Sequence, residues 1–180
     1  RPLVDAGLIP ADFPLSLPSV SGYSGGGRSM IEAYEAGNAP LFEAYALGLS
    51  HKHLPEIMAL TGLQRRPIFI PAVGNFRQGM LVQLPLHLDA LPSRPTAAAL
   101  HDALARHYAA SAAAGGFVKV LPPTQDGKLD ATALNDTNLI ELRVFANESH
   151  RQAVLIARLD NLGKGASGAA VQNLKLMLGL

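Results

Sequence analysis

The chain has 180 residues, of which 48% are hydrophobic and only 16% are charged, with a formal net charge of +1 and no cysteine. This length fits one self-sufficient domain, and the near-neutral charge gives no electrostatic basis for binding nucleic acid or an acidic membrane. The lack of cysteine excludes a disulfide framework and a thiolate metal site, and no apolar stretch reaches the roughly 20 residues that a membrane span needs.

Apolar periodicity, interrupted by glycine and proline, predicts short helices and strands along the whole chain. Residues 1–8 are typical of the end of a helix closed by Gly7. Further helices are expected at residues 29–36, 54–60, 97–113 and 169–180, and strands at 15–17, 42–47, 68–70, 80–88, 118–121, 139–146 and 153–159. Strands with interspersed helices predict an α+β fold, in which a mixed, largely antiparallel sheet carries helices on one face.

Residues 21–28 form a glycine-rich segment that contains Ser24, Gly25 and Arg28. Successive N–H groups in such a turn can hold a phosphate or carboxylate, and an arginine adds a two-pronged donor. The spacing is not that of a P-loop, and a flexible loop with a solvated arginine fits the same residues. Residues 74–80, which include Arg77, are interpreted as a hairpin turn between two strands rather than as a binding loop.

His51 and His53 lie just before Pro55, which is tolerated in the first turn of a helix. If this stretch is extended, both imidazoles leave on one side, about 7 Å apart. They could form an acid/base pair near neutral pH or supply two ligands to zinc. No further ligand stands at a recognisable spacing, so no metal is expected, and two structural histidines bonded to loop carbonyls remain an alternative.

The last 21 residues place a polar pair, Asp160 and Asn161, before a glycine-dense turn and an amphipathic helix. Glycine allows close approach of a ligand and positive φ, while a helix directs free N–H groups and its positive dipole end toward the turn before it. This junction suits an anion or the amide and ribose of a nucleotide cofactor. A tight strand-to-helix turn without a ligand fits equally well. One face of the helix carries Val171, Leu174, Met177 and Leu178.

The order and spacing of residues 21–28, 51–57 and 160–180 resemble the shorter form of the N-acetyl-gamma-glutamyl-phosphate reductase family over nearly the whole chain. Residues 160–166 are also similar to aspartate-semialdehyde dehydrogenases, so the His-Lys-His-Leu-Pro-Glu-Ile segment is the more discriminating one. The resemblance implies a cytoplasmic, NADPH-dependent oxidoreductase of arginine biosynthesis. Such an enzyme reduces N-acetyl-glutamyl phosphate to the semialdehyde and releases phosphate.

The resemblance also implies roles for individual residues. His53 is the expected general acid/base, with His51 as the alternative for that role or as a substrate contact. The expected substrate contacts are Arg28, Ser24 and Arg77, and the expected cofactor contacts are Gly25, Asn161, Lys164 and Gly165. The family's nucleophilic cysteine is expected upstream of Arg1, after a nucleotide-binding domain, so this chain alone is expected to be inactive.

Two parts are expected within the chain. Residues 1–160 are expected to form a substrate-binding and dimerisation domain, as in the C-terminal domain of glyceraldehyde-3-phosphate-dehydrogenase-like enzymes. Residues 161–180 are expected to pack against the nucleotide-binding domain. The apolar composition and a free sheet face predict a homodimer or homotetramer. Alternatives are a related semialdehyde or acetyl-aminoadipyl-phosphate reductase and a non-catalytic dimerisation module, because the shared motifs do not fix the substrate's chain length.

Overall fold

A computed structural model of the chain describes residues 1–179. Within them, seven strands form a single sheet in the order β2-β3-β1-β4-β7-β6-β5. The strands are β1 (Ser16–Gly22), β2 (Phe42–Ala44), β3 (Ile68–Gly74), β4 (Met80–His87), β5 (Val118–Leu121), β6 (Ile140–Asn147) and β7 (Gln152–Leu159). The pairs β1/β3 and β5/β6 are parallel and the other four are antiparallel. The predicted mixed, largely antiparallel sheet is confirmed.

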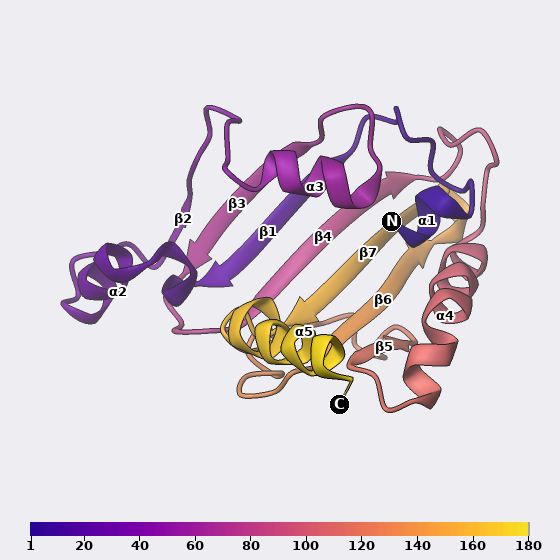
Figure 1. Cartoon of the computed structure of the whole chain (residues 1–180). Coiled ribbons are helices and arrows are strands. Elements are labelled where there is room, and N and C mark those ends of the chain that lie inside the picture. The colour runs from indigo at the N-terminus through magenta and orange to yellow at the C-terminus, as the bar shows by residue number, and fades with distance from the viewer. Residues whose placement is uncertain (180) are drawn as a thin grey trace.

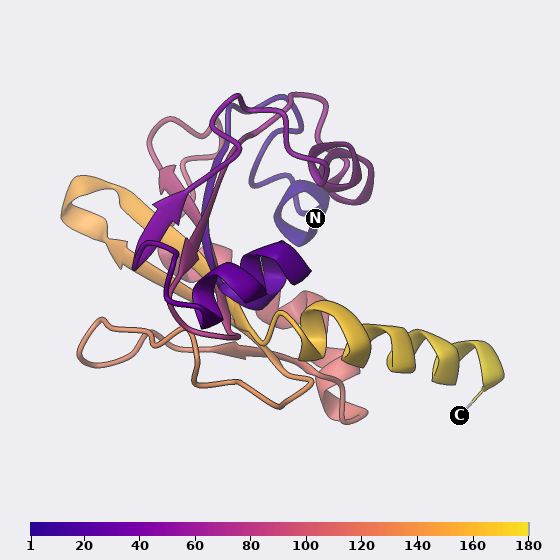
Figure 2. The same cartoon turned by 90° about the vertical axis from the view of Figure 1, so that its left-hand side faces the viewer.

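The described helices, apart from α2, gather on one face of this sheet. The helices are α1 (Pro2–Asp5), α2 (Arg28–Glu35), α3 (Leu54–Thr61), α4 (Ala97–Ala113) and α5 (Gly168–Leu178). Figure 1 shows α1, α3, α4 and α5 in front of the sheet, with α2 beyond the edge formed by β2. The turned view in Figure 2 shows that, among the described residues, no helix covers the opposite face, and that α5 projects away from the sheet.

The sequence sets the limits of the two helices nearest the core and the site. The side chain of Thr96 accepts a hydrogen bond from the Ala99 N–H and so caps α4, whose interior is rich in the strong helix former alanine. Helix α3 has proline in its first turn and ends at Gly62, which adopts the left-handed conformation with φ of 74°. Both helices were predicted, α4 with the same limits.

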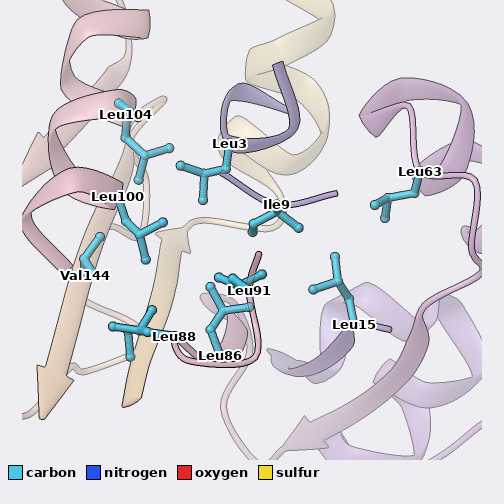
Figure 3. Close-up of a cluster of buried hydrophobic side chains, with 12 residues drawn as sticks. Leu3, Ile9, Leu15, Leu63, Leu86, Leu88, Leu91, Leu100, Leu104 and Val144 are labelled. Carbon is cyan, nitrogen blue, oxygen red and sulfur yellow. The ribbon is translucent and has the colours of Figure 1, made fainter. Parts of the chain in front are cut away.

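A leucine-rich core lies between the sheet and helices α1 and α4, as Figure 3 shows. Leu88 and Leu100 are fully buried, and Leu91 is 1% exposed. The other members of this cluster are Leu3, Ile9, Leu15, Leu63, Leu86, Ala103, Leu104, Val144 and Ala153. Close packing here anchors one end of the sheet, and the candidate site lies toward the other.

The interpretation of residues 74–80 as a hairpin turn was wrong. Strands β3 and β4 do not pair with each other, because β1 lies between them. The connecting loop therefore crosses the end of β1, where Gly22 N–H donates to Gly79 O at 2.9 Å and Ser24 N–H donates to Arg77 O at 3.0 Å. A Cβ at position 22 would lie 2.5 Å from Arg77 O, so this crossing requires glycine.

Several segments differ from the predicted elements, and β3 extends four residues beyond the predicted strand 68–70. Residues 21–28 are not a flexible loop: β1 continues to Gly22 and the 3-10 helix η1 (Tyr23–Gly26) follows, with Ser24 buried. Strand β2 ends at Ala44, because Ala46 has a positive φ of 52°, which a strand does not accommodate. Helix α5 was predicted to run to residue 180, which lies outside the described residues.

Candidate active site

A cavity of about 330 Å³ opens on the helix-bearing face of the sheet. It brings together three segments that are far apart in the sequence: the end of β1 with η1, residues 51–53, and the turn after β7. Six of the nine predicted site residues line it, namely Ser24, Gly25, His51, His53, Asn161 and Gly165. A larger, more open groove of about 740 Å³ lies at the opposite end of the sheet and holds none of them.

The two histidines approach each other more closely than an extended chain would place them. The backbone of His53 is helical, with φ of −79° and ψ of −10°, so the extended arrangement considered for this stretch is not the one adopted. The ring centroids are 4.8 Å apart at an interplanar angle of 66°. The backbone N–H of His53 donates to Nδ1 of His51 at 3.2 Å. That acceptor role leaves the proton of a neutral His51 ring on Nε2.

His51 is the more enclosed of the pair. Its ring makes edge contacts with Phe69 at 5.0 Å and with Tyr45 at 5.9 Å between centroids, whereas His53 is exposed. Burial, and then the nearby charges of His53 and Lys52, lower the pKa of the His51 imidazole below its ordinary value. This enclosure therefore favours the neutral form of the His51 ring over the imidazolium. Burial likewise raises the pKa of the Tyr45 hydroxyl.

Asn161 joins the end of β7 to the end of β1. Its Oδ1 accepts a hydrogen bond from Gly79 N–H at 2.8 Å, and its Nδ2 donates to Ser24 Oγ at 3.0 Å. A Cβ at position 25 would lie 3.3 Å from Ser21 Oγ and 3.5 Å from Asn161 Nδ2. Gly25 thus leaves this corner of the cavity open. One N–H of the Asn161 amide remains free of these two bonds.

Asp160, next to Asn161, is 1% exposed, and its carboxylate stabilises the same part of the cavity wall. Its Oδ2 accepts hydrogen bonds from Gln78 Nε2 at 2.9 Å and from Asp136 N–H at 2.8 Å, and its Oδ1 accepts from Leu162 N–H at 2.9 Å. A buried carboxylate requires such partners. These bonds tie the turn after β7 to the loop before β4 and to residues 135–138.

The glycine-dense turn does not use the positive φ that glycine allows. Gly163, Gly165 and Gly168 all have negative φ; residues 163–167 form the π-helical turn η3, which continues directly into α5. The helical run therefore begins at Gly163 and not at α5, so the first residues of α5 lie one turn inside it. Gly163 and Gly168 instead allow tight packing, since a Cβ would lie 2.3 Å from Thr137 O and 2.1 Å from Asn138 Oδ1, respectively.

Three predicted site residues lie outside the cavity lining. Arg28 forms an exposed ion pair with Glu32 at 2.7 Å. Arg77 has an exposed side chain and contributes its backbone carbonyl to the contact with η1. Lys164 donates to Gln172 Oε1 and lies 5.5 Å from the centroid of the Phe117 ring. The substrate and cofactor roles of these residues stay predictions.

Sequence reasoning missed several side chains in the cavity wall: Ser19, Ser21, Tyr45, Phe69 and Met80. One signal was available. Alternate residues of a strand share a face, and two serines at that spacing, on a strand flanked by apolar residues, indicate a polar patch on a buried face. The contacts of Tyr45 and Phe69 depend on the fold of the segment 42–53 and have no such signal.

Within residues 1–179, no group of three or more histidine, aspartate or glutamate side chains is placed to hold a metal ion. None of the helices in the same range combines the length and hydropathy required to cross a membrane.

Solved structures of low identity share the fold. Aspartate semialdehyde dehydrogenase II from Vibrio cholerae matches with a TM-score of 0.66 at 15% identity, over 99% of this chain and 57% of that one. A probable aspartate-semialdehyde dehydrogenase from Pseudomonas aeruginosa matches with a TM-score of 0.69 at 17% identity, over 98% and 57%. These likenesses concern the fold alone.

Curated relatives are much closer in sequence. N-acetyl-gamma-glutamyl-phosphate reductase of Chelativorans sp. is 53% identical over 99% of this chain, and the protein of that name from Mesorhizobium japonicum is 53% identical over all of it. N-acetyl-gamma-glutamyl-phosphate reductase 2 of Nostoc sp. is 47% identical over the full chain. The chain spans 58% to 59% of the length of these relatives.

A family-level match covers most of the chain. The family described as semialdehyde dehydrogenase, dimerisation domain, matches residues 1–161, which include the whole sheet and every cavity segment up to Asn161. The seven-stranded sheet with its helices on one face agrees with that assignment. The chain belongs to the semialdehyde dehydrogenase dimerisation-domain family.

Proposed function

We propose that this chain is the substrate-binding and dimerisation part of an NADPH-dependent reductase in arginine biosynthesis. The reaction consumes N-acetyl-glutamyl phosphate, NADPH and a proton, and yields N-acetyl-glutamate semialdehyde, NADP⁺ and phosphate. One observation carries the proposal: a single cavity gathers His51, Ser24 and Asn161 from three distant segments. The names of relatives about 50% identical support the choice of substrate.

The histidine pair suits the proton transfer of this reaction. In our proposal His53 donates a proton to the substrate oxygen as the carbonyl is reduced, and takes it back in the reverse direction. Its exposed ring can exchange protons with solvent. His51 supports it through the bond between Nδ1 and the His53 backbone N–H, and is the alternative acid/base. The thiolate that the family uses as nucleophile would come from polypeptide outside this sequence.

The residues present fit a nicotinamide cofactor in part. Gly25, Asn161 and Gly165 line the cavity, Asn161 keeps one amide N–H beyond its two bonds, and the corner left open by Gly25 gives room for a flat group. Lys164 lies outside this wall. When bound, the cofactor supplies the hydride for the reduction. We propose that Gly25, Asn161 and Gly165 position its nicotinamide end.

The division of the chain into two functional parts is also proposed. Residues 1–160 would form the substrate-binding and dimerisation domain, and 161–180 a helix that packs against a nucleotide-binding domain. Helix α5 supports this, because it projects from the sheet (Figure 2) with Leu174 56% and Met177 84% exposed. Exposed apolar side chains of this size usually face a partner surface.

The helix-free face of the sheet is proposed as the surface of self-association. Register places Leu81, Val154, Ile156 and Phe145 on this face, alternating with the side chains that enter the core. A homodimer that stacks two such faces would cover them. Ile156→Lys is expected to yield monomers in sedimentation analysis, while Leu60→Lys, at a 68% exposed position on α3, should keep the assembly. Equal masses for both variants would refute this surface.

An assay of the complete gene product tests the activity. The expected result is oxidation of NADPH that depends on N-acetyl-glutamyl phosphate and releases one phosphate per NADPH. The acyl phosphate with one more methylene is the matched comparison, since a preference for it would assign the related aminoadipyl reductase instead. The 180-residue chain by itself should be inactive because it holds no cysteine. Activity of that chain would overturn the mechanism, and an inactive complete product would favour a non-catalytic module.

A further inference from the structure

We propose that Ser19 is a substrate-binding residue that donates its hydroxyl proton to an anionic oxygen of the substrate, with Ser21 as a second donor beside it. The inference rests on the reductase function proposed above and goes beyond it by naming the residues of the cavity wall that recognise the substrate. It concerns the floor of the cavity, where the helix-bearing face of β1 is polar.

Ser19 is buried without a partner. It is 4% exposed, and its Oγ is fully covered and makes no hydrogen bond within the described residues. Register sets it between Pro71 of β3 and Val82 of β4, neither of which offers a side-chain acceptor. An unpaired buried hydroxyl destabilises a fold, so a serine here calls for a ligand that supplies the missing bond.

Strand geometry determines the sheet face on which this side chain lies. Ser19 and Ser21 alternate with Val20, so both face the helix-bearing side together with Pro71. Both serines and Pro71 line the cavity. Ser21 is 9% exposed, and its Oγ lies about 7 Å farther along the strand. The pair thus spans the length of a short acyl chain.

The polar and charged groups that line the cavity indicate that its ligand is an anion. The lining holds the hydroxyls of Ser19, Ser21 and Ser24, the ammonium of Lys52 and the two imidazoles, and none of its described side chains is an aspartate or glutamate. A wall of hydrogen-bond donors and a lysine ammonium, without a carboxylate, favours oxygen anions. The proposed substrate carries two anionic groups, the carboxylate of its acyl chain and its phosphoryl group.

Kinetics of the complete enzyme in the reverse direction, from aldehyde to acyl phosphate, distinguish binding of the carboxylate from binding of the phosphoryl group. In that direction the aldehyde, which carries the carboxylate, and inorganic phosphate are separate substrates with separate KM values. Ser19→Ala is expected to raise one KM about tenfold or more, as befits loss of a hydrogen bond to a charged group, with kcat changed less than about threefold. A rise for the aldehyde assigns Ser19 to the carboxylate, and a rise for phosphate assigns it to the phosphoryl group.

The controls for this test are a second serine variant on the same strand and a measurement of Tm. Ser16→Ala changes the same strand, but residue 16 lies on the opposite face of the sheet from Ser19. This variant should leave both KM values within about twofold of the parent's. The Tm of Ser19→Ala should equal or exceed that of the parent, because its hydroxyl has no protein partner to lose. If Ser19→Ala does not fold, Ser19→Cys, which keeps the size with a weak donor, serves in its place.

An active parent enzyme whose two KM values are both unchanged in Ser19→Ala would overturn the assignment of Ser19 and leave the reductase function standing. A lower Tm with unchanged KM values would make the hydroxyl structural and would overturn it too. A complete gene product without reductase activity would remove the proposed function, and this inference with it.

Discussion

The two ends of one sheet face serve different purposes in this molecule. Under α1 and α4 the face is filled with leucine, as in Figure 3, whereas toward the ends of β1 and β3 it borders the cavity. The change occurs within a few residues: Leu15 belongs to the core, and Ser19 and Ser21, at the same parity, face the cavity. Side chains on one side of a single strand can thus pack in the core at one end and line a cavity at the other.

The energetics of the two ends differ accordingly. A buried leucine contributes about 1.5 to 3 kcal/mol through removal of apolar surface from water. Ser19 and Ser21 contribute little of this kind, and a buried hydroxyl without a partner works against folding. The site end therefore depends on hydrogen bonds of Asp160 and Asn161 for its shape, and on the leucine end for its stability.

Loss of a core leucine should give the largest effect on stability. Leu100→Ala removes a fully buried side chain of α4 and is expected to lower the free energy of unfolding by about 3 kcal/mol, because it leaves a cavity in a close-packed cluster. Urea denaturation followed by circular dichroism measures it. Leu60→Ala, at an exposed position on α3, is the control and should change the value by less than about 0.5 kcal/mol. Equal losses in both variants would contradict the assignment of the core.

Loss of the Asp160 carboxylate should come next. Asp160→Asn keeps the shape but replaces an acceptor oxygen with an NH₂ group, so one of the three bonds from Gln78, Asp136 and Leu162 must break. The expected loss is about 2 kcal/mol, measured by the same denaturation. Asp89→Asn, at an exposed position, should be neutral within about 0.5 kcal/mol. A neutral Asp160→Asn would show that this corner does not depend on the carboxylate.

The two ends also differ in how well the sequence predicts them. Helix α4 and strand β5 were predicted with their observed limits, because local periodicity and glycine stops decide such elements. The gathering of Ser24, His51 and Asn161 followed only from the family resemblance. The hairpin assigned to residues 74–80 was wrong because strand pairing is a long-range property. The π-helical form of η3 depends on contacts of Gly163 and Gly168 with residues 137–138, which local sequence does not reveal.

A smaller effect is expected from the acid titration of His51. Its pKa is lowered by burial, so the unfolded chain binds the proton more readily than the folded one, and stability falls as the pH drops from 6.5 through the lowered pKa. His51→Gln should therefore lose less stability between pH 7.5 and pH 5 than the parent, as measured by denaturation at both values. His150→Gln, at an exposed position of the β6–β7 connection, is the matched control. An unchanged pH dependence in His51→Gln would argue against an enclosed imidazole.

Arg28 should show the smallest effect on stability. Its side chain is 92% exposed and its only described ion pair joins it to the 62% exposed Glu32 one helical turn away, so Arg28→Ala should change the free energy of unfolding by less than about 0.5 kcal/mol. Because the Arg28→Ala variant should be as stable as the parent, a change in the KM of the complete enzyme would report directly on contact between Arg28 and the substrate. A rise of about tenfold would support the contact predicted from the sequence. An unchanged KM would confine substrate recognition to the cavity wall around Ser19, Ser24 and the histidines.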